Sequence, residues 1–194
     1  NMKLSGSYQI NLTKQKVWEA LNDPEILKKT IPGCEEFKKN SDTEFSATAT
    51  NKIGPFNASF TGNIELKDLN PPHSYKISGS GNSPVGFASG EAEVKLEDEN
   101  GETKLIYTVE ANVGGKIAQV GSRLIDMTAK KMADIFFGKF SELVSNKTDI
   151  LKTEKVSDAR VPREKKPFNK ILIYSSLIII IATIIYSISW ITPR

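Results

Sequence analysis

The chain has 194 residues, of which 39% are hydrophobic, and a formal net charge of +3. The charge is uneven: residues 146–170 hold eight basic and four acidic side chains, whereas residues 1–145 hold 17 basic and 19 acidic ones. A nucleic-acid-binding domain needs the opposite distribution, and one Cys excludes an intramolecular disulfide. The single histidine, His73, follows an Asn-Pro-Pro turn, which indicates an incidental surface residue.

The first predicted elements are one strand and two short helices. Residues 3–11 alternate between polar and apolar side chains, which is the period of a half-buried strand. Thr13 precedes a helically spaced apolar run and is the expected N-cap of the first helix. Asp23 and Pro24 are typical of the cap and the first residue of a second helix. This second helix is expected to end at the turn formed by residues 31–33.

A series of strands is predicted after Cys34. Turn residues divide this part of the chain into six strands, which should form an antiparallel meander. The clearest strand is residues 56–66, whose two faces are cleanly separated into apolar and polar. Together with the first strand, the meander gives a curved antiparallel sheet of seven strands. The dividing turns lie at residues 40–42, 54–55, 70–72, 82–84 and 99–101.

From about Lys116 to Ser145 the apolar spacing becomes helical and predicts one long helix across the apolar face of the sheet. Phe137 and Phe140 fall outside its apolar stripe. They should either form an exposed contact with a partner or membrane, or be covered by the two short helices or by the residues after the helix. The predicted stripe contains Ile117, Val120, Gly121, Leu124, Ile125, Met132, Ile135 and Leu143, with Gln119, Arg123, Asp126, Lys130 and Asp134 opposite.

The strand residues expected to face this helix are unusually small. They include Ala47, Ala49, Ala58, Gly62, Gly79, Gly81, Ala88, Gly90, Ala92 and Ala111. Such residues either leave a cavity or let a strongly bent sheet approach the helix closely, and the sequence leaves both interpretations open. A cavity here would suit a lipophilic ligand. Its predicted lining is Tyr8, Phe60, Ile64, Tyr107, Ile117, Val120, Gly121 and Leu124.

No catalytic residue and no metal site is predicted. The inward positions contain no paired carboxylates, and the inward hydroxyls of Tyr8 and Tyr107 have no evident base beside them. Each is expected to be a core tyrosine whose hydroxyl is satisfied at the edge of the sheet. We therefore expect a protein that is not an enzyme.

The C-terminal part predicts attachment to a membrane. Residues 171–191 are 21 uncharged, isoleucine-rich residues, and a helix of this length spans about 31 Å, close to the roughly 30 Å of a bilayer core. Residues 146–170 are expected to be a basic flexible tether, and residues 192–194 a short tail. Because basic residues cluster before the span, residues 1–145 should face the cytoplasm from a single-pass anchor in the cytoplasmic membrane.

Three sequence motifs add a family resemblance. They are Val17-Trp18-Glu19-Ala20-Leu21-Asn22-Asp23-Pro24, Ile31-Pro32-Gly33-Cys34-Glu35, and Gly114-Gly115-Lys116-Ile117-Ala118-Gln119-Val120-Gly121-Ser122-Arg123-Leu124-Ile125. With the order of elements, they resemble the carbon monoxide dehydrogenase CoxG family of the START-like (SRPBCC) superfamily. The resemblance covers roughly residues 2–145. It implies an α+β helix-grip fold, in which a seven-stranded curved sheet wraps around a long C-terminal helix.

The resemblance also implies a function. Members attach a molybdenum-containing carbon monoxide dehydrogenase to the cytoplasmic membrane and handle a quinone, so the expected cofactor is a non-covalently bound quinone or another isoprenoid lipid. Membrane lipids and the dehydrogenase complex are the other expected partners, and Gln119 and Arg123, on the outer side of the helix, are the expected partner surface. Two alternatives remain: a structural membrane anchor without a ligand, and a START-like cyclase or hydrolase.

Overall fold

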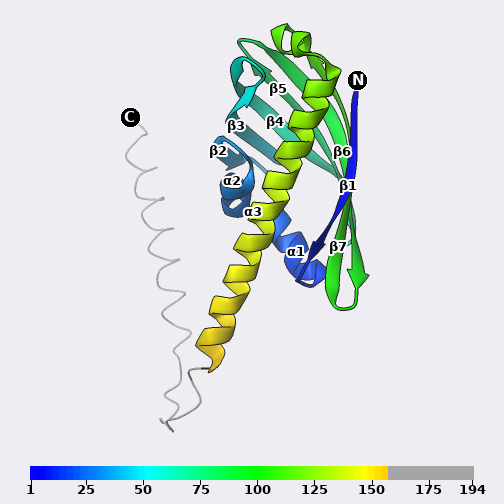
Figure 1. The fold of residues 1–194 in the computed structure, drawn as a ribbon. Helices are drawn as coiled ribbons and strands as arrows, with labels where there is room; N and C mark the ends of the chain where they lie inside the picture. Colours follow the sequence, from blue (N-terminus) through cyan, green and yellow to red (C-terminus); the bar gives the residue numbers. More distant parts are fainter. Residues whose placement is uncertain (157–194) are drawn as a thin grey trace, which may run out of the picture. The chain divides into compact units, whose positions relative to one another are not determined.

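The computed structural model describes the backbone of residues 1–156 and the side chains of residues 1–146. Its seven strands form one antiparallel sheet in the order β1-β7-β6-β5-β4-β3-β2, so the predicted meander is confirmed and β1 closes it beside β7 (Figure 1). The strands are β1 (Met2–Ile10), β2 (Cys34–Lys39), β3 (Glu44–Ile53), β4 (Phe56–Asn70), β5 (Ser74–Ser83), β6 (Gly86–Glu99) and β7 (Glu102–Gly114).

The two short helices form where the capping residues predict them. Helix α1 (Lys14–Leu21) begins after Thr13, whose side chain accepts a hydrogen bond from the backbone N–H of Lys16. Helix α2 (Pro24–Thr30) begins after Asp23, which accepts one from the N–H of Glu25 at 2.9 Å. Each bond satisfies an N–H that has no partner within the first turn of the helix.

The long helix differs from the prediction because the chain breaks at Gly121. Residues Lys116–Val120 form a short 3-10 helix, η1, and the α-helix α3 runs from Ser122 to Val156. Gly121 has a φ of +90°, which side chains other than glycine rarely adopt, so it separates the two helices. The glycine at this position is therefore explained by backbone conformation.

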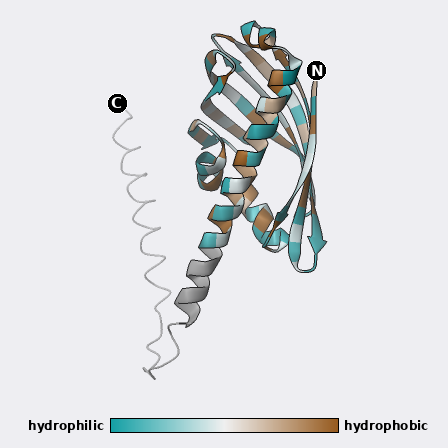
Figure 2. Ribbon diagram, viewed as in Figure 1, coloured by the Kyte–Doolittle hydropathy of each residue, from teal (hydrophilic) through white to brown (hydrophobic). Residues whose placement is uncertain are grey.

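The burial of its side chains also corrects the predicted orientation of the long helix. Helix α3 lies across the concave face of the sheet (Figure 1), with hydrophobic and hydrophilic residues alternating along it (Figure 2). Phe137 is 8% exposed and Phe140 is fully buried, and both belong to the core that the sheet forms with α1 and α2. The prediction assumed that one continuous helix runs through Gly121. In the structure, η1 and α3 are separate helices, so the face that η1 presents does not continue along α3. The buried or half-buried residues of α3 that meet the core or the space above it include Ala129, Met132, Ala133, Phe136, Phe137, Phe140 and Val144.

The end of α3 lies further along the chain than predicted. The helix continues to Val156, so the first part of the predicted flexible tether is helical; residues 146–156 contain strong helix formers and no proline. Within the described residues, no helix is long and apolar enough to cross a membrane. The predicted span at residues 171–191 and tail at 192–194 lie outside them.

Candidate functional site

An apolar cavity of about 490 Å³ lies between the concave face of the sheet and α3. Its walls come from all seven strands, from the end of α1, from α2 and the loop after it, and from the middle of α3. The described residues that line it carry no charged side chain. They are Met2, Leu4, Leu21, Leu27, Ile31, Pro32, Phe37, Phe45, Ala49, Asn51, Ile64, Leu66, Tyr75, Ile77, Ala92, Val94, Leu105, Tyr107, Val109, Ala129, Met132, Ala133, Phe136 and Phe137.

Small residues contribute to this arrangement in two ways. Ala49 and Ala92 line the cavity and leave volume in it. Gly62 has a different role: a Cβ built there would lie 2.0 Å from the carbonyl oxygen of Ser80, so the neighbouring strand leaves no room for a side chain. The small residues thus leave volume at some positions and allow close contact between neighbouring strands at others, and the contact at Gly62 is not an approach of the sheet to the helix.

Two of the predicted lining residues, Ile64 and Tyr107, lie at the cavity. Tyr8 lies beside the aromatic wall, where its ring stacks on that of Phe137 with 4.3 Å between the ring centroids. Phe60 lies on the same face of β4, but its side chain covers Gly81 on the neighbouring strand. Neither Tyr8 nor Phe60 is among the residues that line the cavity.

The four predicted lining residues after Lys116 lie elsewhere. The buried side chain of Ile117 packs near Gly86, the first residue of β6. Val120 and Leu124 lie over Gly54, in the turn between β3 and β4. Gly121 is exposed at the break between η1 and α3. Ile117, Val120 and Leu124 therefore lie at the turns at one end of the sheet, because η1 and the first turn of α3 pack there and not over the cavity.

One polar pair joins the edge strand to the long helix. The hydroxyl of Tyr8 on β1 donates a hydrogen bond to the carboxylate of Asp134 on α3. Burial and then this hydrogen bond raise the pKa of Tyr8, so its hydroxyl keeps its proton at neutral pH. Asp134 was expected on the opposite side of the helix, and the rotated phase of α3 brings it to the edge of the sheet instead.

The predicted partner surface is accessible. Gln119 in η1 and Arg123 in the first turn of α3 are both exposed, as the predicted surface requires. Exposure by itself assigns them no role, so the surface stays a prediction.

Sequence reasoning missed Tyr75, the most enclosed polar residue of the cavity wall. Tyr75 lies on β5 and is 5% exposed, and burial raises the pKa of its hydroxyl. It shares its face with Ile77 and Gly79, and the alternation that placed Gly79 inward could have placed Tyr75 there too.

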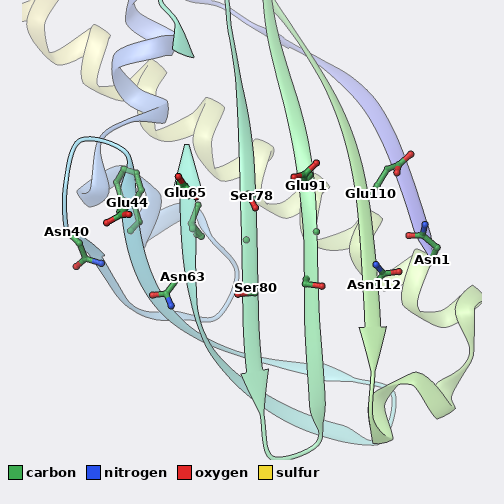
Figure 3. A pocket seen from close by; sticks show the side chains of 15 residues that line it. Asn1, Asn40, Glu44, Asn63, Glu65, Ser78, Ser80, Glu91, Glu110 and Asn112 are labelled. Carbon is green, nitrogen blue, oxygen red and sulfur yellow. The ribbon is translucent and has the colours of Figure 1, made fainter. Parts of the chain in front are cut away.

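A second hollow, of about 710 Å³, lies on the face of the sheet turned away from α3 and is polar (Figure 3). Carboxylates, amides and serine hydroxyls line it, among them Glu91 and Glu110. Glu110 is already paired with Lys3 at 2.9 Å. Among the described residues, no group of three or more His, Cys, Asp or Glu side chains could hold a metal ion. The cavity under α3 is therefore the better candidate site.

Comparisons with known proteins agree with this fold. The family model for CoxG, a subunit of carbon monoxide dehydrogenase, matches residues 6–145. A conserved protein from Geobacillus kaustophilus is 31% identical, with a TM-score of 0.71 over 75% of this chain and 96% of that chain. No curated protein matches.

Two further solved structures share the fold at low identity. An uncharacterised protein from Rhizobium leguminosarum is 13% identical, with a TM-score of 0.57 over 75% of this chain and 95% of its own. The Zhui aromatase/cyclase from Streptomyces sp. R1128 is 12% identical, with a TM-score of 0.58 over 76% of this chain and 95% of its own. At this identity the likeness concerns the fold alone.

Proposed function

The chain belongs to the carbon monoxide dehydrogenase CoxG family, and from this we propose that it is a non-catalytic accessory protein that holds a quinone-like lipophilic ligand between sheet and helix. The family description names a subunit of the dehydrogenase, which supports a role beside that enzyme. The same proposal includes recruitment of a molybdenum-containing dehydrogenase to the cytoplasmic membrane.

The observation that carries the ligand proposal is the cavity of about 490 Å³. Protein interiors are normally packed with few voids larger than a water molecule, so an apolar space of this size beside α3 supports a ligand-binding role. Ligand pockets begin at roughly 300 Å³ and are mostly apolar with a few polar groups. A neutral ring system fits these walls, whereas an anion would find no cationic side chain among the described lining residues.

Support for membrane attachment comes from the sequence after α3. The uncharged residues 171–191 and the basic residues before them favour a single-pass anchor that leaves the cavity domain on the cytoplasmic side. A lipophilic ligand partitions into the bilayer, so a carrier held at the membrane meets its ligand there. Exposed Gln119 and Arg123 are the residues we assign to docking of the dehydrogenase.

The direct test is extraction of lipids from purified full-length protein, followed by mass spectrometry, together with a pull-down of the dehydrogenase. An isoprenoid quinone in near-stoichiometric amount is the expected result, and Gln119→Glu with Arg123→Glu should weaken the pull-down without changing bound lipid. Extracts that contain no quinone, combined with no binding on titration, would leave the structural anchor as the better description.

The Tyr8–Asp134 pair favours a second candidate, a cyclase-like or hydrolase-like enzyme, because a hydroxyl hydrogen-bonded to a carboxylate can take part in proton transfer. Tyr8 does not line the cavity, however, so its hydroxyl is not placed against a bound ligand. Turnover of a polyketide or ester substrate that Tyr8→Phe abolishes would support the enzyme over the carrier.

A further inference from the structure

Tyr75 is a buried residue whose hydroxyl has no hydrogen-bond partner among the described residues. The residue is 5% exposed, and no hydrogen bond joins its hydroxyl to a side chain or backbone group within residues 1–146. Every fully enclosed polar side-chain atom of the described residues does have a partner. The Tyr75 hydroxyl must therefore touch open volume, and the open volume that this side chain lines is the apolar cavity.

The position of Tyr75 is fixed from two sides. On β5 it pairs with Val94 of β6, and both side chains line the cavity. Its ring meets the ring of Trp18 on α1 edge to face, with 5.2 Å between the centroids and an interplanar angle of 85°. Strand pairing and this ring contact leave the hydroxyl little freedom to turn away, so it is preorganised to meet a ligand.

Resting on the proposed function, we propose that Tyr75 determines specificity by donating a hydrogen bond to a carbonyl oxygen of the ligand, a neutral ring compound such as a quinone. An unpaired polar group in an apolar site is unfavourable, and a ligand that brings an acceptor removes this cost, whereas a pure hydrocarbon does not. The described lining offers an acceptor ligand few other donors, since the amide of Asn51 already donates to the carbonyl of Pro32.

The protonation state and the surroundings of Tyr75 favour a carbonyl over other groups. Burial raises its pKa above the ordinary value of 10.0, so at neutral pH the hydroxyl is a donor and not a phenolate. A carboxylate on the ligand would also accept the bond, but it would be desolvated without a cation nearby. The chemical class selected is therefore uncharged, apolar and equipped with at least one ketone-type oxygen.

Tyr107 provides the matched control. It pairs with the same Val94 from the other side, is 7% exposed and also lines the cavity. Its ring lies over Gly6 of β1, where a Cβ would come within 2.7 Å of the Tyr107 hydroxyl oxygen. The hydroxyl thus lies toward the edge strand, on the side where Asp134 further raises its pKa.

The test compares full-length wild type, Tyr75→Phe and Tyr107→Phe by equilibrium dialysis in one fixed detergent concentration. The probes are 2-methyl-1,4-naphthoquinone and 2-methylnaphthalene, which share a ring skeleton but differ in the carbonyls. Each probe partitions into the micelles to the same extent with all three proteins. The ratio of a variant's affinity to that of wild type therefore reports the effect of the substitution alone. Tyr75→Phe should weaken quinone binding roughly three- to tenfold, the range for one hydrogen bond, and leave hydrocarbon binding unchanged.

The outcomes separate cleanly. Equal losses for both probes would assign Tyr75 to packing, and a selective loss in Tyr107→Phe alone would move the donor to Tyr107; either result overturns the proposal. If wild type binds neither probe, the proposed function fails and this inference with it.

A thermal melt gives an independent check: ligand-free Tyr75→Phe should melt at the same or a higher temperature, because it removes an unpaired hydroxyl. A lower melting temperature would mean that the hydroxyl has a protein partner and is not available to a ligand.

Discussion

Enlarging a residue inside the cavity should stabilise the ligand-free protein, whereas the same change in a packed region should destabilise it. Ala92 on β6 lines the cavity, and Ala58 on β4 is 1% exposed and lies outside it. Ala92→Leu and Ala58→Leu therefore form a matched pair, because they make the same substitution in strands of the same sheet. Open volume lies next to the side chain at Ala92 and not at Ala58.

The expected magnitudes follow from the volume. Leucine adds about three carbon atoms, which at roughly 0.8 kcal/mol each would contribute about 2 kcal/mol when buried, less about 0.5–1 kcal/mol of side-chain entropy. A cavity of about 490 Å³ accommodates these atoms without displacing its walls. Ala92→Leu should thus raise the free energy of unfolding by about 1–2 kcal/mol. Ala58→Leu should lower it by about 1–3 kcal/mol, the usual cost of overpacking.

Denaturant unfolding of both full-length variants measures this difference, and a thermal scan should show shifts of roughly 2–4 °C per kcal/mol. Ala92→Leu should also weaken binding of 2-methyl-1,4-naphthoquinone, because it occupies the same volume as the ligand. If Ala92→Leu destabilises the protein as much as Ala58→Leu does, the space is packed in solution and the argument from cavity volume is wrong.

Four further results are expected. Tyr8→Phe removes the hydrogen bond between β1 and α3 and should lower the unfolding free energy by about 1 kcal/mol in denaturant titrations; an unchanged midpoint would mean that the bond does not form in solution. Burial raises the pKa of Tyr75 in the folded state, so the folded protein favours the neutral hydroxyl. The contribution of Tyr75 to stability is therefore present below pH 10.0 and lost as the pH rises further. Tyr75→Phe should reduce the fall in unfolding free energy measured above this pH. Gly121→Ala should lower the unfolding free energy by about 1 kcal/mol or more, because Gly121 has a φ of +90°. Gly138→Ala, in the interior of α3 with open space around it, should raise the unfolding free energy by roughly 0.5–1 kcal/mol. Equal effects of the two substitutions would contradict the conformational role of Gly121. Deletion of residues 171–194 should leave a folded protein that no longer sediments with membranes, and a truncated product that aggregates would indicate that these residues pack on the domain.

The strands and short helices were predictable because their signals are local. Alternation with a period of two assigns each strand residue to a face without reference to the rest of the chain, and the strand of residues 56–66 is confirmed within β4. The caps at Thr13 and Asp23 act within a few residues and are confirmed at α1 and α2. The small residues on the concave face indicated the cavity correctly but not its outline.

The phase of the long helix was not predictable in the same way. A helical stripe depends on every residue keeping its rotation of about 100°, and one glycine with a positive φ resets it. The predicted wheel placed Leu124 at the cavity and Phe140 outside the stripe, the reverse of their positions, whereas Met132 and Leu143 of the same stripe do face the cavity or the core.

The sequence by itself determined the order of the strands and helices, the side of the sheet that faces the long helix, and the family motifs, because neighbouring residues encode each of these. Only the tertiary structure decided which residues surround the cavity, that Tyr8 meets Asp134, and that Tyr75 is enclosed without a partner. These features depend on where segments distant in the chain come to lie, and that follows from the packing of α3 against the whole sheet.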